Sequence, residues 1–356
     1  MTEQNLSSAQ QNFSPPPPQD PAPSLPPAPH IQSFQPPQET KTLQYHRLSH
    51  ADGRTRWWSP LVEGVLGGAI YLALSAVVGA LFFFSLLGES LTEADFTLEG
   101  MQNNALIDPA FFAMMFGSIA IMFPALWIAR LVLGPKPWGL VHSVLGRMRW
   151  SWLFLCTGIS IIMFVLLPVV FALLSGDALR LEANISTSSM IWLMVLIFGL
   201  VPLQCYAEEL VFRGYLMQTL GSWLKHPAWA IILPAPLFML GHAYGAWGQL
   251  SILVMGVVAG FMAWYTGGLE APIAMHVVNN VSLMFMGVMG LAAPFAQNDL
   301  TFVDFFWATG VELLLVGLVI FAARKVGVAR QNTFRVVISP KKWVKMSIED
   351  RAKAAF

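Results

Sequence analysis

The sequence predicts an all-α fold, a polytopic transmembrane helical bundle with about eight spans. Of the 356 residues, 56% are hydrophobic and only 11% are charged, and the mean hydropathy is +0.60. A soluble globular domain carries about 25% charged residues. Most of the surface of this chain must therefore face lipid instead of water. The formal net charge is zero, which gives no reason to expect a nucleic acid partner.

Eight apolar runs approach the length of about twenty residues that a bilayer crossing requires. They cover residues 61–87, 110–133, 152–174, 190–206, 229–244, 249–265, 272–289 and 305–323. The fifth and sixth runs are short. No internal repeat is evident, which argues against a transporter built from inverted repeats.

Basic residues are concentrated in alternate connecting segments, as the positive-inside rule requires of cytoplasmic loops. The segment 88–109 holds only acidic charges, whereas 134–151 and the segments flanking the first and last spans are basic. The basic residues are Lys41, Arg47, Arg54, Arg56, Lys136, Arg147, Arg149, Arg324, Lys325, Arg330, Arg335, Lys341, Lys342 and Lys345. Both termini should therefore be cytoplasmic, which agrees with an even number of spans. The short tails and the lack of a targeting signal indicate a bacterial cell (inner) membrane.

The chain divides into three predicted regions. Residues 1–50 are polar and proline-rich, with four consecutive prolines at 15–18, and cannot bury enough apolar surface to fold. They are predicted to be a disordered cytoplasmic tail, with a ligand for a proline-binding domain as the alternative. Residues 57–325 form the transmembrane helical domain, and 326–356 form a basic cytoplasmic tail. Cys156 and Cys205 lie in separate apolar runs and are expected to be packing residues.

The first candidate functional group is Glu208, Glu209 and Arg213, at the end of the fourth apolar run. An ionisable residue inside a span is costly and is a functional hypothesis by default. Two adjacent carboxylates repel each other and lose hydration, which favours a proton on one of them and suits a general base. Glu209 and Arg213 are four residues apart and can pair on a helix. Glu208 is rotated by about 100° and stays free. The alternative is a purely structural ion-pair cluster.

Two further groups follow in the next apolar segments. His242 ends the run that begins at Phe238, and His276 precedes Asn280 by four residues, so that this pair shares one helix face. Each group taken alone is more simply explained as a core histidine or as a helix-to-helix hydrogen bond. Taken together, carboxylates and imidazoles on neighbouring segments are the usual means of deprotonating water, and a His/Asn pair can stabilise an oxyanion.

The three motifs, in this order, resemble the signature of the CPBP family. They are Glu208-Glu209-x-x-x-Arg213, Phe238-x-x-x-His242 and His276-x-x-x-Asn280. This family comprises the CAAX-protease and bacteriocin-processing (Abi) proteins and includes the type II CAAX prenyl endopeptidases. The resemblance covers residues 190–290 and implies an all-helical intramembrane endopeptidase.

The resemblance also implies a role for each matching residue. Glu208 and His242 would activate the water, His276 and Asn280 would bind the oxyanion, and Glu209 and Arg213 would support the site structurally. The family is often labelled as metalloprotease, although a metal-free glutamate mechanism is also argued for it. The sequence lacks the His-Glu-x-x-His motif of zinc proteases. We therefore expect no cofactor. The alternative is a zinc ion held by Glu208, His242 and His276.

Simple spans leave a geometric difficulty at this site. Glu208 and His276 fall near the cytoplasmic ends of their helices, whereas His242 falls about 20 Å away, near the far end of its own. The groups can converge if the fifth span is tilted or re-entrant, or if 203–223 continues as a buried helix that turns back at Lys225-His226-Pro227. In the second case the two segments form an antiparallel pair. Glu208 and His242 would then lie at one level. That arrangement leaves the position of His276 to be explained.

Three classes of function compete at this stage. The predicted substrate of a peptidase is a peptide or a membrane-associated protein, and prenylated CAAX proteins are not expected in a bacterium. A non-enzymatic immunity or scaffold protein would gain nothing from buried charges. An ion-coupled transporter would use Glu208 and Glu209 as a relay. The ionisable residues, however, cluster in one place and do not line a path.

Overall fold

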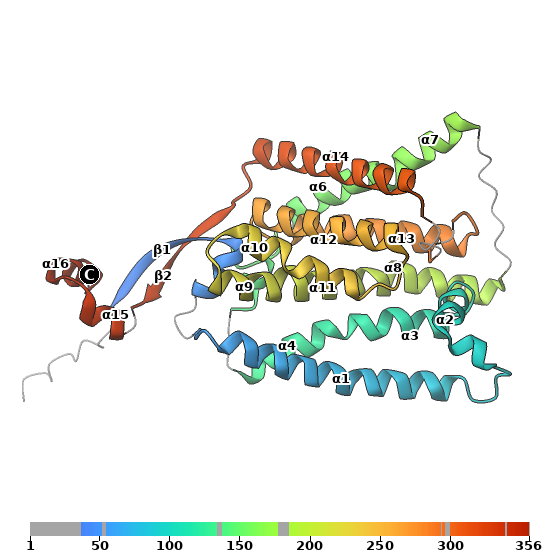
Figure 1. The fold of residues 1–356 in the computed structure, drawn as a ribbon, viewed down its shortest axis with the longest axis horizontal. Coiled ribbons are helices and arrows are strands. Elements are labelled where there is room, and N and C mark those ends of the chain that lie inside the picture. The colour runs from blue at the N-terminus through green and yellow to red at the C-terminus, as the bar shows by residue number, and fades with distance from the viewer. Residues whose placement is uncertain are drawn as a thin grey trace, which may run out of the picture. The chain divides into compact units, whose positions relative to one another are not determined.

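The computed structural model describes residues 37–51, 55–133, 137–176, 185–292, 294–295, 300–338 and 340–355. Most of the predicted proline-rich tail, residues 1–36, lies outside this range. The described part is a helical bundle in which seven stretches are long and apolar enough to cross a membrane, and Figure 1 shows them side by side. The predicted fold class is therefore confirmed.

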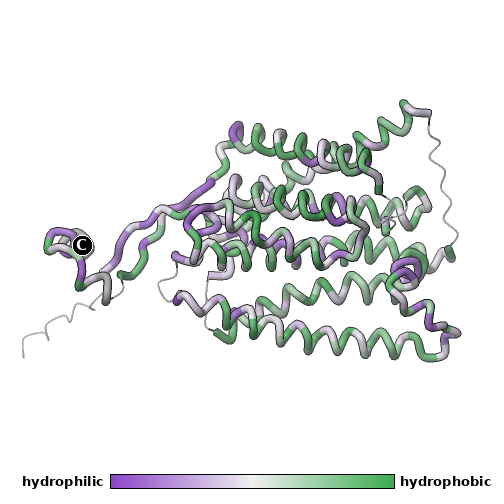
Figure 2. The backbone as a smooth tube through the Cα atoms, viewed as in Figure 1, coloured by the Kyte–Doolittle hydropathy of each residue, from purple (hydrophilic) through white to green (hydrophobic). Residues whose placement is uncertain are grey.

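The seven long stretches include one pair of consecutive helices and two helices interrupted by π-helical segments. They are α1 (Ser59–Ser85), α3 (Pro109–Ala120) with α4 (Met122–Val132), α6 (Trp150–Ile161) with η3 (Ile162–Leu166) and α7 (Leu167–Ser175), α8 (Thr187–Glu209) with η4 (Leu210–Leu216) and α9 (Met217–Trp223), α12 (Ala246–Thr266), α13 (Glu270–Val288) and α14 (Phe302–Val326). Helices satisfy every backbone polar group internally, which lipid demands. Figure 2 shows that hydrophobic residues run along these helices.

The connections carry short elements. On one side of α3 lie η2 (Glu93–Phe96) and α2 (Leu98–Ala105), and the one-turn helix α5 (Gly139–His142) precedes α6. Three clusters of buried apolar side chains fill the spaces between the long helices. The cluster formed by α3, α8 and the end of α13 includes Phe112, Ile197 and Met284. It fixes α13 against α8, the contact on which the candidate site depends.

The fifth predicted span, 229–244, is shorter than the others. It consists of α10 (Pro227–Ile232) and α11 (Pro234–Leu240), which together form one short apolar helical stretch. Pro234 starts α11 at its first position, because proline cannot continue the hydrogen-bonding of a preceding helix. At 1.5 Å per residue such a stretch spans about 20 Å, less than the hydrocarbon core of about 30 Å.

The fourth span is longer than the predicted 190–206, because the helix continues through η4 and α9 to Trp223. The chain then turns at 224–226, and α10 packs against α9 while α11 packs against η4. The expectation that 203–223 is a helix paired with the following segment is therefore confirmed. The segment η4 begins directly after Glu209. Single π-helical turns of this kind are frequent at functional sites.

The prediction of a disordered tail over residues 1–50 is wrong for its last part. Strand β1 (Gln38–Gln44) pairs antiparallel with β2 (Gln331–Val337), with Gln38 opposite Val337 and Gln44 opposite Gln331. The 3-10 helix η1 (Tyr45–Ala51) follows β1. This segment lacks the prolines of the preceding residues, and it buries Tyr45 and Leu48 against the bundle.

The basic segment after α14 is also structured in part. It contains β2, α15 (Pro340–Lys345) and α16 (Ile348–Ala355). The β1–β2 ribbon is mostly hydrophilic (Figure 2). Because the two strands pair, the residues before the first span and those after the last lie at the same end of the bundle.

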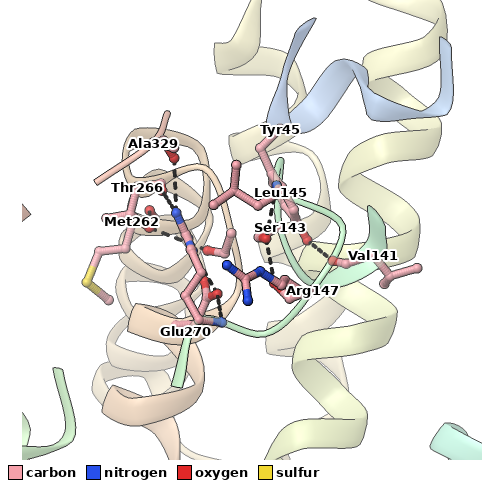
Figure 3. Close-up of polar contacts among 11 residues, drawn as sticks. Tyr45, Val141, Ser143, Leu145, Arg147, Met262, Thr266, Glu270 and Ala329 are labelled. Atoms are coloured by element: carbon pink, nitrogen blue, oxygen red, sulfur yellow. Dashed lines mark hydrogen bonds and ion pairs between the residues drawn. The ribbon is translucent and has the colours of Figure 1, made fainter. Parts of the chain in front are cut away.

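A buried ion pair joins four segments at that end of the bundle. Arg149 donates from Nη2 to Glu270 Oε2 (2.6 Å) and from Nε to Glu270 Oε1 (2.8 Å). Its Nη1 also donates to the carbonyl oxygens of Thr266 (2.9 Å) and Ala329 (3.0 Å). The hydroxyl of Tyr45 donates to the carbonyl of Val141 close by (Figure 3). These bonds fix the start of α6 relative to the start of α13. They therefore also fix the position of His276 along the bundle.

Candidate active site

Glu208, Glu209 and Arg213 lie on one continuous helix, at the junction of α8 and η4. All three side chains are buried, with 5%, 0% and 2% of their surface exposed. Arg213 Nη1 donates to Glu209 Oε1 over 2.8 Å, which is the four-residue pairing that the spacing predicts. The Arg213 guanidinium also lies 4.3 Å from the centre of the Phe238 ring and donates to the carbonyl of Gly256 (3.4 Å). The pair is therefore enclosed by α11 and α12.

His276 lies between the two glutamates. It is 1% exposed and comes from the second turn of α13, which packs against α8. His276 Nδ1 is 2.9 Å from Glu209 Oε1, and because a carboxylate only accepts, Nδ1–H is the donor. His276 Nε2 lies 3.4 Å from Glu208 Oε2. The antiparallel packing of α8 and α13 thus brings His276 to the level of the glutamates, which simple spans left unexplained.

The contact between Glu208 and His276 has the distance of an ion pair and lacks the geometry of a hydrogen bond. Glu208 Oε2 accordingly has no hydrogen-bond partner among the described residues. Glu209 Oε2 is also unpartnered there. Burying a polar atom without a partner costs free energy and calls for an explanation, such as a bound water or a catalytic role. The carboxyl of Glu208 therefore has an oxygen that could bind a further ligand.

The charges of this cluster do not balance without an extra proton. Glu208 and Glu209 contribute two negative charges, and Arg213 contributes one positive charge. Uncompensated charge in a dry interior costs several kcal/mol per ion. A proton on His276 or on Glu208 neutralises the cluster, and these two groups face each other across 3.4 Å.

His242 lies in the turn after α11, half-buried, and reaches the cluster through Phe238. The Phe238 ring lies 4.9 Å from the His242 ring and 5.9 Å, edge to face, from the His276 ring. His242 Nδ1 is 3.0 Å from the Phe238 carbonyl, so Nδ1–H donates and Nε2 is left available. Gln249 Nε2 donates to the His242 carbonyl and fixes the turn. His242 thus stands beside the cluster, with Phe238 between the two imidazoles.

Asn280 lies one turn beyond His276 on α13, as the spacing predicts. Its Oδ1 accepts a hydrogen bond from Asn279 Nδ2 (3.0 Å), which leaves its own amide N–H groups as donors. Within the described part of the chain, no hydrogen bond joins Asn280 to Glu208, His242 or His276. The structure therefore places Asn280 on the expected helix face without direct contact to the other site residues.

Several residues contact the site that the sequence did not single out. Cys205 Sγ lies 3.7 Å from the His276 carbonyl. Tyr244 packs against the His242 ring, and the charge of Glu208 acts on its hydroxyl. Gly256 allows close approach, because a Cβ there would lie 3.0 Å from Ala235 Cβ. Only Gly256 gives a signal in the sequence, since small residues mark close helix contacts in membranes.

The residues of the alternative zinc site do not form a metal-binding set. Within the described ranges, no group of three or more His, Cys, Asp or Glu side chains could hold a metal ion. Glu208 and His276 approach each other, whereas His242 contacts the Phe238 ring and has no ion pair with Glu208 in the described ranges. The arrangement does not fit a three-ligand zinc site, and we derive no chemical step through one.

An apolar cavity lies beside the cluster, between α6, α8 and α13. It has a volume of about 680 Å³ and is lined by residues that include Phe154, Leu203, Ile273 and Val277. At one end, His142 Nε2 and the Tyr206 hydroxyl lie 2.7 Å apart. Leu203, Ile273 and Val277 come from the same helices as the glutamates and His276. The cavity is therefore suited to a hydrophobic group, although the predicted site residues are not among those that line it.

Comparison with known proteins agrees with this site. Residues 187–282 match a family model described as type II CAAX prenyl endopeptidase Rce1-like. This segment runs from α8 to α13 and contains every predicted site residue. Residues 187–282 therefore form an Rce1-like domain, and the resemblance to the CAAX protease family is confirmed. With its seven long apolar helices, the chain is an integral membrane protein.

One relative is similar over most of the chain. The "Uncharacterized protein YyaK" of Bacillus subtilis (strain 168) is 25% identical over 288 residues. This alignment covers 73% of the present chain and 90% of the relative. No solved structure matches the chain.

Proposed function

We propose that the protein is an intramembrane endopeptidase in which Glu208 removes a proton from the attacking water. The observation that carries the proposal is His276, held by Glu209 on one ring nitrogen and facing the unpartnered carboxylate oxygen of Glu208 with the other. A carboxylate with a free oxygen, next to an oriented imidazole, can accept a proton and then return it.

The proposed reaction follows from these positions. The water oxygen attacks the carbonyl carbon of the scissile peptide bond while one water proton passes to Glu208, with His242 Nε2 as the second group that orients the water. His276, protonated on Nε2, and the Asn280 amide stabilise the oxyanion. The C–N bond then breaks, and Glu208 transfers the proton to the leaving amine. Glu209 and Arg213 do not react. They hold the orientation of His276 and favour its protonated form.

The proposed substrate is a peptide or a membrane-associated protein. The apolar cavity between α6, α8 and α13 supports a substrate with a hydrophobic segment. We further propose that the protein lies in a bacterial cell membrane with both termini in the cytoplasm. The β1–β2 pairing supports termini on one side, and the basic residues of that end favour the cytoplasmic side.

The experiment that tests this function compares the wild-type protein with Glu208→Gln. Both are purified as full chains in lipid nanodiscs, incubated with solubilised membrane proteins and a peptide library, and searched for new N-termini by mass spectrometry. The wild type should generate new N-termini that Glu208→Gln does not. Glu99→Gln, an exposed carboxylate in α2, is the matched control and should cleave normally. Equal cleavage by wild type and Glu208→Gln would refute the proposal.

A further inference from the structure

A second cavity, which is polar, lies at the end of the bundle that carries the β1–β2 ribbon. Its volume is about 540 Å³, and its lining includes Lys41, His46, Arg47 and Lys225. These residues come from β1, η1 and the turn between α9 and α10. Two segments far apart in the sequence, the consecutive β1 and η1 and the turn that holds Lys225, therefore bring basic side chains to one place. The peptidase mechanism uses none of them.

The charges around this cavity are strongly unbalanced. No acidic residue is among those that line it in the described structure. Glu39, the acid nearby, forms an ion pair with Lys41 at 2.9 Å. Arg47 donates to the Gly221 carbonyl (2.6 Å), which fixes its guanidinium while leaving its charge uncompensated. Like charges gathered without counter-charges repel one another, so an anion in the cavity would relieve that repulsion.

His46 gives the second, independent observation. Its side chain lines the cavity and is only 1% exposed. Its Nε2 donates to the Lys225 carbonyl (3.2 Å), and its Nδ1 is a buried nitrogen without a hydrogen-bond partner in the described structure. Burial lowers the pKa of His46, and the charges of Arg47 and His226 lower it further, against the effect of the hydrogen bond to Lys225. A bound anion would supply the missing negative charge, and because that charge favours the protonated imidazole, Nδ1–H could then donate to the anion.

We propose that this cavity binds a phosphate group. Lys41, Arg47 and Lys225 supply three cations, and a protonated His46 Nδ1 supplies a hydrogen-bond donor, which together suit a phosphate monoester or diester. Two exposed tryptophans lie close to Lys225 in the chain or in space: Trp223 donates from Nε1 to the carbonyl of Trp57 (2.8 Å). Their exposure places the cavity at the membrane surface. Exposed tryptophans mark the level of lipid headgroups. The phosphate therefore comes from an anionic lipid or from a soluble phosphate compound. The inference does not depend on the peptidase activity.

The test measures binding to the purified full chain by native mass spectrometry, with phosphatidylglycerol, diacylglycerol and inorganic phosphate as probes. The wild type should bind phosphatidylglycerol or inorganic phosphate and show no preference for diacylglycerol, which has no phosphate. Lys225→Gln should weaken binding about fivefold, and Lys41→Gln with Lys225→Gln about 25-fold, because each surface cation contributes about 1 kcal/mol. Lys325→Gln, an exposed lysine in the last turn of α14, is the matched control and should bind like the wild type.

Each outcome either tests the proposal or identifies the source of the phosphate group. Retention of phosphatidylglycerol in excess inorganic phosphate identifies a lipid headgroup, whereas displacement identifies a soluble phosphate compound. Neither probe binding to the wild type would overturn the proposal. Equal affinities of the Lys41→Gln/Lys225→Gln protein and the Lys325→Gln protein for the probes would also overturn it. Melting temperatures measured without ligand show that the variants are folded, so that weak binding cannot be blamed on unfolding.

Discussion

Glu208 and Glu209 should have different roles, one in catalysis and one in stability, and substitution of each by glutamine distinguishes these roles. Glu209 Oε1 accepts hydrogen bonds from Arg213 (2.8 Å) and from His276 (2.9 Å), and its side chain is fully buried. In Glu209→Gln, the buried Arg213 loses its charged partner and keeps only neutral groups, which include the Gly256 carbonyl and the faces of the Phe238 and Phe212 rings. Removing one partner of a buried ion pair costs about 3–5 kcal/mol. Even a desolvated cation–π contact returns only about 2 kcal/mol.

The expected result is therefore a loss of stability for Glu209→Gln and a loss of catalysis for Glu208→Gln. Glu208 has no hydrogen-bond partner to lose on Oε2, so its amide variant should melt near the wild-type temperature. General-base catalysis contributes about 10²–10⁴-fold, and cleavage should fall by that factor. This corresponds to about 3–5 kcal/mol of activation free energy. Arg213→Gln should resemble Glu209→Gln, and the double variant should recover part of the lost stability.

The assay measures detergent-extracted yield, melting temperature and peptide cleavage for the wild type and these four variants. An unstable Glu208→Gln together with a stable but inactive Glu209→Gln would show that the roles are reversed. If the destabilisation by Glu209→Gln and by Arg213→Gln is simply additive in the double variant, the two side chains are not coupled, and the ion-pair argument fails. Normal cleavage by all four variants would remove the site from the mechanism altogether.

Three further predictions concern the metal, the topology and the ion pair at the bundle end. The protein should keep its activity after exhaustive chelation and contain no stoichiometric zinc by elemental analysis. Activity lost to a chelator and restored by zinc would favour the zinc-dependent alternative instead. Reporter fusions after Glu99 and after Lys345 should report opposite sides of the membrane, and the same side for both would contradict the topology. Glu270→Gln leaves Arg149 buried without its carboxylate and should cost about 3–5 kcal/mol, seen as a lower melting temperature. The exposed control Glu99→Gln should change stability by no more than about 0.5 kcal/mol, and an equal effect of both variants would contradict a role for the Arg149 pair.

The helices could be predicted from hydropathy, but their ends could not. The fourth span was predicted to stop at residue 206, because the charges of Glu208, Glu209 and Arg213 interrupt the apolar run. In the structure these charges neutralise one another within the protein, and the helix continues to Trp223. The strand β1 was missed because its partner lies at the other end of the chain. No local pattern reveals a pairing between residues so far apart.

The site was predictable to the extent that its contacts are local. The pairing of Glu209 with Arg213 follows from four-residue spacing, whereas the contact of His276 with both glutamates depends on how α13 packs against α8. The place of Phe238 between His242 and His276 is likewise a result of packing. The roles of Glu208, His242, His276 and Asn280 in catalysis stay predictions. So does the cytoplasmic location of the termini.

The pairing of β1 with β2 constrains how the chain can be inserted into a membrane. One strand is made before the first span and the other after the last, so the ladder can form only when both emerge on the same face of the bilayer. That condition requires an even number of crossings between Gln44 and Gln331, which the seven long stretches meet only if the shorter α10–α11 stretch counts as the eighth. If one span were inserted in the wrong direction or stayed outside the membrane, β1 and β2 would lie on opposite faces of the bilayer. Their unpaired backbone edges would then be free to aggregate. The ribbon is thus completed last and only in correctly threaded molecules, which makes its formation a measurable sign of correct insertion.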